Sequence, residues 1–261
     1  MNGITKSNML DGDTFERLAK KHNLFYSTTH LLRSERQVDS IAALPAPANV
    51  LSHNSDGGIP APGEQLSWFD FVWSEAPSNI GHWFAQNCDV RDPRLTPIPI
   101  GLECDRWHPP SMKKDIILAT PQMPRDGLVY LNHKVRASHR TARQVILDLF
   151  ADKLWVTFEQ GRSFEHYAQQ LARHKFVFSP DGNGMDCVRT WEALYLGCYP
   201  LVERHVFTEE FAEYLPLLII DDWSAVTEDF LNARYSEMVV KWWDWNALTV
   251  RWWDRLIGRW M

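Results

Sequence analysis

The segment best suited to chemistry is a glycine-containing loop between an apolar strand and a helix. It reads Ser-Pro-Asp-Gly-Asn-Gly-Met-Asp and follows the apolar run 176–178. Glycines let backbone amides approach a ligand closely, and the unpaired N–H groups of a helix N-terminus attract negative charge. The loop therefore predicts a diphosphate site, with Asp186 or Asn183 as the N-cap of the helix. The expected contacts from this loop are Ser179, Gly182, Asn183, Gly184 and Asp186.

Two charged side chains on the following helix extend this candidate site. Arg189 and Glu192 follow Asp186 at three-residue intervals, so the three residues lie along one helix face. Arginine forms charge-assisted hydrogen bonds to phosphate, and glutamate accepts hydrogen bonds from two neighbouring ribose hydroxyls. The alternative is a solvated helix face on which Arg189 and Glu192 pair with each other. The preceding glycine loop favours ligand binding.

A basic segment after the apolar run 128–131 is a second source of donor contacts. In a parallel sheet, ligands bind beyond the carboxyl ends of the strands, which is where this segment lies. Its candidate phosphate or base contacts are Asn132, Lys134, Arg136 and Arg140. For each of these residues, a solvated helix start is an equally good interpretation.

Candidate acceptor-side residues lie in the first half of the chain. Asp56 follows an apolar strand and precedes two glycines, which suits a general base, with His53 in reserve. A turn cap is the alternative role for Asp56. Trp83 is a candidate platform for a sugar ring, and Gln86 and Asn87 are candidate polar contacts to the acceptor.

The order of apolar and amphipathic runs predicts an α/β protein with three parts. Residues 127–235 alternate short apolar strands with helices, as a doubly wound parallel sheet requires. The expected parts are a reduced α/β domain over 1–110, a Rossmann-like domain over 111–240, and a C-terminal helix over 241–261. Residues 1–47 contain too little for a complete βαβ layer, and the proline-rich stretch 105–126 is expected to be a linker. Prolines 97 and 99 predict that the strand at 95–101 is an edge strand.

The tryptophan-rich tail is expected to form one helix. Its apolar residues recur every three or four positions, which predicts one broad face packing back across both domains. Contact of this helix with a membrane surface is the alternative. The residues of the face are Trp242, Trp245, Leu248, Trp252, Leu256 and Trp260.

Composition narrows the function class. The chain has 261 residues and a formal net charge of -6, which argues against a dedicated nucleic-acid binder. It has no apolar window long enough to span a bilayer and no apolar leader, so we expect a cytoplasmic protein. Its four cysteines lack metal-ligand spacing and are expected to be reduced thiols. The sole Asp-x-Asp pair, Asp11 and Asp13, precedes a helix pattern and is interpreted as a helix start, so no metal is expected.

The run 175–202 carries a resemblance to a known family. It joins the glycine loop to Arg-x-x-Glu-Ala-Leu and then Gly-Cys-x-Pro, and it resembles the donor-site segment of exostosin-like glycosyltransferases. Upstream and downstream segments extend the resemblance over about half the chain. It implies a GT-B-like fold, two Rossmann-like domains with a cleft between them, and inverting transfer from a UDP-sugar to a glycan or other hydroxyl acceptor. By this resemblance, Arg189 contacts the diphosphate and Glu192 the ribose.

Two other function classes remain as alternatives at this point. A non-catalytic carbohydrate-binding module would keep aromatic platforms and polar loops without a base. A nucleotide-dependent oxidoreductase would use the spacing Gly182-x-Gly184-x-x-Cys187, although cysteine stands where that fingerprint has its third glycine.

Overall fold

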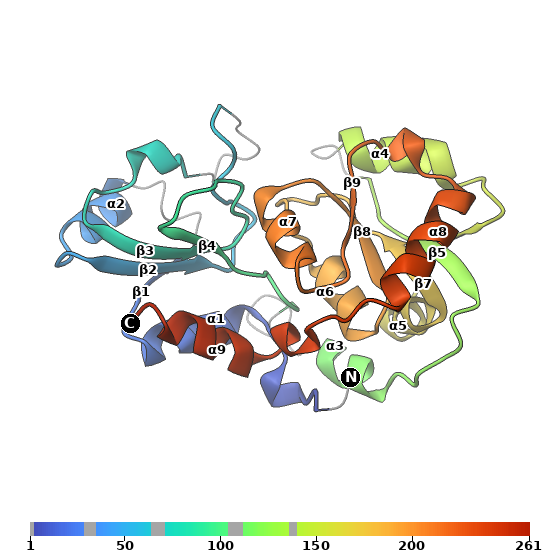
Figure 1. Ribbon diagram of the computed structural model, residues 1–261, viewed down its shortest axis with the longest axis horizontal. Coiled ribbons are helices and arrows are strands. Elements are labelled where there is room, and N and C mark those ends of the chain that lie inside the picture. Colours follow the sequence, from blue (N-terminus) through green and yellow to red (C-terminus); the bar gives the residue numbers. More distant parts are fainter. Residues whose placement is uncertain (1–2, 29–34, 64–70, 104–111, 136–139) are drawn as a thin grey trace.

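Two parallel β-sheets form the framework of the protein. The computed structural model describes residues 3–28, 35–63, 71–103, 112–135 and 140–261. The first sheet has four strands and the second has five, and helices lie against both (Figure 1). The α/β class with parallel sheets is therefore confirmed.

The first sheet has the strand order β1-β2-β3-β4. It begins with a parallel β1-α2-β2 unit, in which Phe25 aligns with Val50 and Thr28 with His53. Residues 1–47 hold only the β1 and α2 parts of this unit, as expected, because β2 begins at Ala48. β4 lies at an edge, as its prolines predict. The elements are α1 (Gly12–Lys21), β1 (Phe25–Thr28), α2 (Glu35–Ala42), β2 (Ala48–His53), β3 (Ile80–Ala85) and β4 (Leu95–Pro97).

The second sheet has the order β6-β5-β7-β8-β9 and alternates strands with helices, as expected from the sequence. Its strands are β5 (Gly127–Leu131), β6 (Val156–Phe158), β7 (His174–Phe178), β8 (Tyr199–Glu203) and β9 (Leu218–Ile220). Its helices are α4 (Arg140–Phe150), α5 (Phe164–Arg173), α6 (Val188–Tyr195), α7 (Val206–Ala212) and α8 (Glu228–Val239). Short 3₁₀ helices are η1 (Lys6–Asn8), η3 (Trp73–Glu75), η5 (Trp223–Ala225) and η6 (Trp245–Leu248).

Side-chain caps fix where several helices begin. The Asp11 carboxylate accepts a hydrogen bond from the Thr14 N–H, which confirms Asp11 as a helix-start residue. Ser163 and Thr227 cap α5 and α8 in the same way. The stretch expected to be a linker contains helix α3 (Lys113–Ala119), which packs against α5. Residues 104–111 of that stretch lie outside the described residues.

The C-terminal segment departs from the predicted single helix. The chain leaves α8 at Val239, forms η6, and then enters α9 (Val250–Gly258). Asp244 causes this break, because its side chain caps η6 while its N–H donates to the Tyr214 carbonyl. The buried side chains are consequently Trp243, Leu248, Trp253 and Ile257, whereas Trp242 is 78% exposed.

Helix α9 packs beside α1 of the first half, next to α7 of the second (Figure 1). The Trp253 ring lies 5.9 Å from that of Phe15 and 6.3 Å from that of Phe211. The tail therefore contacts α1 of the first half and α7 of the second. In the described part of the chain, no helix is long and apolar enough to cross a membrane.

Trp253→Ala is expected to lower the free energy of unfolding by about 3 to 5 kcal/mol, because it leaves a cavity where α1, α7 and α9 meet. Urea unfolding monitored by circular dichroism measures this change. The matched control is Trp242→Ala, which removes a largely exposed ring and should change stability by less than about 1 kcal/mol. Equal effects of the two variants would contradict the packing role of Trp253.

Candidate functional site

A cavity of about 530 Å³ is lined by residues from both halves of the protein. Asp56, Ile100 and Glu103 come from the first half, and the remaining lining residues follow position 112. The cavity lies beyond the carboxyl ends of β5 and β7, where an open parallel sheet binds ligands. The predicted site residues that line it are Asp56, Asn132, Lys134, Gly182, Asn183, Gly184, Asp186, Arg189 and Glu192.

Arg189 and Glu192 do not form the solvated pair that was the alternative interpretation. Glu192 is 5% exposed, and its carboxylate lies 3.2 Å from the Lys113 ammonium group. Lys113 also pairs with Glu103, so it joins the two halves at the cavity wall. Arg189 instead donates to the Asn132 side-chain oxygen at 3.3 Å. Its guanidinium group therefore lies at the cavity beside the end of β5.

Sequence reasoning missed further cavity residues, five of which carry a cationic group or an aromatic ring. Lys113 lay in a stretch expected to be a linker, and Arg143 ended the basic segment without being among its candidate contacts. The Arg143 guanidinium donates to the Asp181 carbonyl at 2.8 Å and so braces the glycine loop. The Tyr167 side chain is 7% exposed and reaches the cavity with its hydroxyl group unpaired among the described residues. Arg162 and Phe164 complete the set.

Asp186 has a structural role in place of the predicted cap. Helix α6 begins after Cys187, which has no side-chain capping bond. The buried Asp186 carboxyl group accepts hydrogen bonds from the Ile100 N–H at 2.6 Å and the Trp191 indole N–H at 2.8 Å. Burial raises the pKa of Asp186 to about 7, although these hydrogen bonds oppose the shift.

The two loop glycines are required by protein contacts. A Cβ atom at Gly184 would lie 2.6 Å from the Asn87 side-chain nitrogen and 2.7 Å from the Asp56 carbonyl oxygen. One at Gly182 would lie 2.8 Å from both an Arg143 nitrogen and the Cys187 sulfur. The Gly182 N–H already donates to the Gly184 carbonyl. Close approach of a ligand to the backbone is the explanation that the sequence suggests for these glycines. That explanation is incomplete, because packing between protein segments already favours glycine here.

Asp56 is the exposed acid that the first half contributes to the cavity. Its carboxylate accepts a hydrogen bond of 3.0 Å from the Asn183 side-chain amide. The candidate base and the glycine loop, predicted independently, therefore meet at one cavity. Asp56 can accept a proton from a group bound there, because its carboxylate faces solvent-filled space.

His53 does not fit the role of reserve base. Its ring is fully buried, stacks on Phe15 at 4.7 Å, and places Nε2 2.8 Å from the Pro99 carbonyl oxygen. Burial lowers the pKa of His53 to about 4, so the ring stays neutral at pH 7. It stabilises the interior beneath the loop, away from the cavity lining.

The three predicted acceptor contacts are also interior residues. Trp83 is fully buried, packs on Phe71 and donates to the Ser52 hydroxyl, so it offers no platform for a sugar. The Gln86 amide accepts from the Asn54 N–H and donates to the Ser55 carbonyl.

Asn87, the third of these residues, accepts a hydrogen bond of 2.6 Å from the Asp186 N–H through its side-chain oxygen. Its side-chain nitrogen donates to the carbonyls of Ser55 and Asp56 at 3.3 and 3.2 Å. Both Gln86 and Asn87 therefore shape the loop that carries Asp56.

The remaining predicted donor contacts have mixed outcomes. Ser179 is buried outside the cavity lining, and its hydroxyl is 2.9 Å from that of Thr190. Lys134 is exposed at the cavity, with no acidic partner for its ammonium group within the described ranges. Arg136 and the side chain of Arg140 lie outside the described residues.

One cluster beside the glycine loop has metal-ligand residue types. Within the described ranges, one ligand atom each from Asp181, Glu203 and His205 falls within 4.8 Å of the others. The His205 ring bridges Asp89 and Asp181, with ring nitrogens 3.0 Å from each carboxylate. Burial opposes the charge on the ring, but these two carboxylates raise the pKa of His205 to about 10. A proton on His205 thus links the ring to Asp89 and Asp181, and Glu203 accepts a hydrogen bond from the Asp181 N–H.

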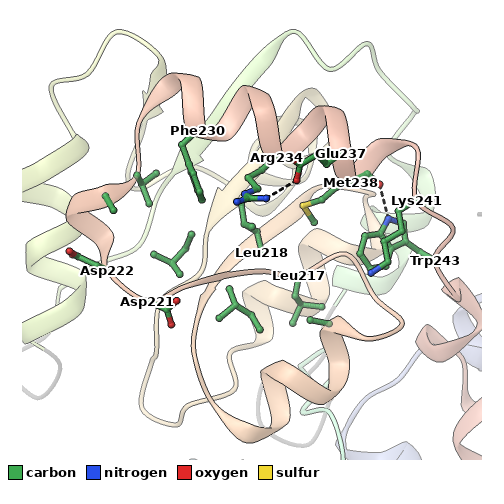
Figure 2. Close-up of a pocket in the computed structure, with 15 residues that line it drawn as sticks. Leu217, Leu218, Asp221, Asp222, Phe230, Arg234, Glu237, Met238, Lys241 and Trp243 are labelled. Atoms are coloured by element: carbon green, nitrogen blue, oxygen red, sulfur yellow. Dashed lines mark hydrogen bonds and ion pairs between the residues drawn. The ribbon is translucent and has the colours of Figure 1, made fainter.

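A second cavity of about 530 Å³ lies between β9 and α8 (Figure 2). Its walls are mostly apolar, and Arg234 pairs with Glu237 on its rim. The Trp243 indole donates to the Met238 carbonyl instead of pointing a polar group at a ligand. The cavity lacks the converging polar groups of the site at Asp56.

Comparison with protein-family models and with curated proteins finds no match to this chain. The function must accordingly be argued from the geometry of the cavity.

Asp186→Asn is expected to flatten the pH dependence of stability. The folded-state pKa of Asp186, about 7, exceeds its ordinary value of 3.8. Between these values the folded protein keeps a proton that the unfolded chain has lost, so the free energy of unfolding falls as pH rises. Urea unfolding at several pH values from about 4 to about 7 should show a smaller decline in the variant.

Asp181 contributes a decline of the same sign, because its pKa is also raised to about 7, mainly by burial. A residual slope is therefore expected in Asp186→Asn. An unchanged slope would show that Asp186 is ionised in the folded protein.

Proposed function

We propose that the protein is a glycosyltransferase. It transfers a sugar from a nucleotide-sugar donor, a UDP-sugar, to a hydroxyl group of a glycan or similar acceptor, with inversion and without an obligatory metal. One observation carries this proposal. The candidate base Asp56 lines the same cavity as Arg189 and the 182–187 loop. In this proposal the two sheets belong to the two domains of a GT-B-like fold, and the cavity belongs to its cleft.

The donor diphosphate binds the cationic side of the cavity. Arg189 lies next to Asn132 at the carboxyl end of β5, and Lys134 presents an exposed ammonium group from the same segment. Charge-assisted hydrogen bonds from these groups stabilise the negative charge that develops on the leaving diphosphate. In this role they supply the positive charge that a bound metal supplies in other transferases.

Glu192 receives the ribose hydroxyls in this proposal. Its carboxylate is already oriented by Lys113, which itself contacts Glu103. One carboxylate oxygen can bind Lys113 while the other accepts from a ligand, since a carboxylate has several acceptor sites. The lysine therefore holds Glu192 in position and offsets its charge near an anionic donor.

Asp56 acts as the general base. Its carboxylate takes the proton of the acceptor hydroxyl while the hydroxyl oxygen forms a bond to the anomeric carbon and the bond from that carbon to the diphosphate oxygen breaks. Attack from the face opposite the leaving group inverts the anomeric configuration. The Asn183 amide, which donates to Asp56, orients the carboxylate during this step.

The positions of the tryptophans weigh against a purely carbohydrate-binding module. Trp83 is buried, and the Trp73 indole is bonded to Asp92, so neither offers a sugar platform at the cavity. Phe164 and Tyr167 are the aromatic residues that line it. Trp68 lies outside the described residues. An enzyme with a base at the cavity therefore fits the arrangement better.

Arg189→Ala is expected to weaken UDP binding by about 1.5 to 3 kcal/mol, the range for hydrogen bonds to charged groups. Isothermal titration calorimetry with EDTA present measures this affinity and also tests whether UDP binds without a metal. The matched control is Arg234→Ala, an exposed arginine on α8 that should leave UDP affinity unchanged. UDP binding that requires manganese or magnesium would refute the metal-independent proposal, and equal affinity in both variants would refute the role of Arg189.

Asp56→Asn is expected to lower the rate of sugar transfer by about 10² to 10⁴ while UDP affinity is retained, because an amide cannot accept the proton. UDP release measured with a panel of UDP-sugars and hydroxyl acceptors, beside calorimetry, separates the two effects. Asp152→Asn, which changes an exposed acid outside the cavity, is the control. Normal transfer by Asp56→Asn would remove the assignment of the base, and UDP binding without transfer by the wild type would favour the binding module.

A further inference from the structure

Helix α9 carries a row of three arginines on its outer face. Arg251, Arg255 and Arg259 are exposed and follow one another at four-residue intervals, so Arg251 and Arg255 lie one turn apart on α9 and Arg259 lies at its C-cap. The opposite face holds Trp253 and Ile257, which are buried in the core. The packing of the tail therefore fixes the direction in which the arginine row points.

The arginine row is unfavourable for the isolated fold. Like charges four residues apart on a helix repel each other. The helix dipole disfavours Arg251 in the first turn of α9 but favours Arg255 in its last turn, so the repulsion within the row is the unfavourable contribution. None of the three guanidinium groups has an acidic partner among the residues that the structure describes. The row is therefore available to an anionic partner.

Helix α1 extends this basic surface. It runs beside α9 (Figure 1), and its Lys21 ammonium group lies 2.7 Å from a carboxylate oxygen of Asp254. Lys20 pairs with Glu16, and Arg17 is exposed on the same helix. The acids on these two helices are thus largely engaged by lysines, which leaves the arginine row uncompensated.

We propose that the outer face of α1 and α9 binds an anionic lipid surface. The formal net charge of the whole chain is -6, so this positive face contrasts with an acidic remainder. A planar membrane meets one face of a protein, whereas a long polyanion that wraps the molecule would also meet its acidic parts. Trp260, which directly follows Arg259, stacks one face of its ring on His82 at 3.8 Å and keeps half of its surface exposed, and tryptophan is favoured at the interface between lipid and water.

This surface differs from a membrane-inserting amphipathic helix. The apolar side chains of α9 are occupied in the core, so binding rests on the arginines and is electrostatic. Adding salt therefore releases the protein from the membrane. The proposal is independent of the donor cavity, since none of these residues lines it.

Vesicle sedimentation tests the proposal directly. The full chain is expected to sediment with vesicles of phosphatidylcholine and phosphatidylserine, to stay in solution with phosphatidylcholine alone, and to be released at high salt. The triple variant R251Q/R255Q/R259Q is expected to bind the anionic vesicles on the order of 100-fold more weakly, since each basic residue near such a surface contributes about fivefold. Its circular dichroism spectrum and UDP affinity should match those of the wild type.

The matched control is K153Q/R173Q/R234Q, which removes three exposed cations from other elements. This variant should bind anionic vesicles as the wild type does. An equal loss of vesicle binding in both triple variants would show that binding depends only on the net charge of the protein, and would overturn the proposal. Absence of vesicle binding by the wild type would do the same, as would tight binding of heparin or RNA with no binding of vesicles.

Discussion

The side chain of Asn87 joins the two halves of the protein at the cavity. It donates to carbonyl groups of the loop that carries Asp56 and accepts from the N–H of Asp186, and its own backbone has a φ of 52°. Asparagine is one of the few residues other than glycine that adopts this conformation readily. The surrounding chain makes room for it, because a Cβ atom at Gly58 or Gly184 would collide with Asn87.

The hydrogen bonds of the two side-chain amides after β3 explain why Gln86 and Asn87 lie in the interior. Gln86 and Asn87 satisfy loop carbonyl and N–H groups that would otherwise be buried without partners, a costly situation in a protein interior. The loop they hold then presents Asp56 on the outside, opposite Asn183. A polar residue after a strand can therefore support a site without touching the ligand. The residue type alone does not distinguish a residue that contacts the ligand from one that holds a loop in place.

The sequence predicted the second half of the fold well, because each short apolar strand there is followed by a clear amphipathic helix. The prediction failed where an element was too short to show a pattern or where it depends on a tertiary contact. β1 has four residues, α3 lies among prolines, and the break before α9 depends on a tertiary hydrogen bond from Asp244 to Tyr214. Lys113 was missed for the same reason, since only the packing of α3 on α5 brings it to Glu192. The predicted loop residues of the cavity follow strands, where the geometry of parallel sheets places ligands, and Arg189 and Glu192 extend the site along α6.

Whether the glycine loop can bind an anionic ligand depends on the charge of its buried acids, Asp181 and Asp186, as well as on Arg189. Asp181 and Asp186 lie in this loop, and two ionised carboxylates there would repel a diphosphate. Burial raises the pKa of each to about 7, and the protonated ring of His205 pairs with Asp181. The loop therefore presents less negative charge than its sequence suggests, and the basic side chains of Arg189 and Lys134 line the same cavity. Burial gives Asp181 and Asp186 structural roles and also lowers their negative charge. In the proposed enzyme, a loop that contains two carboxyl groups can therefore form part of a diphosphate site.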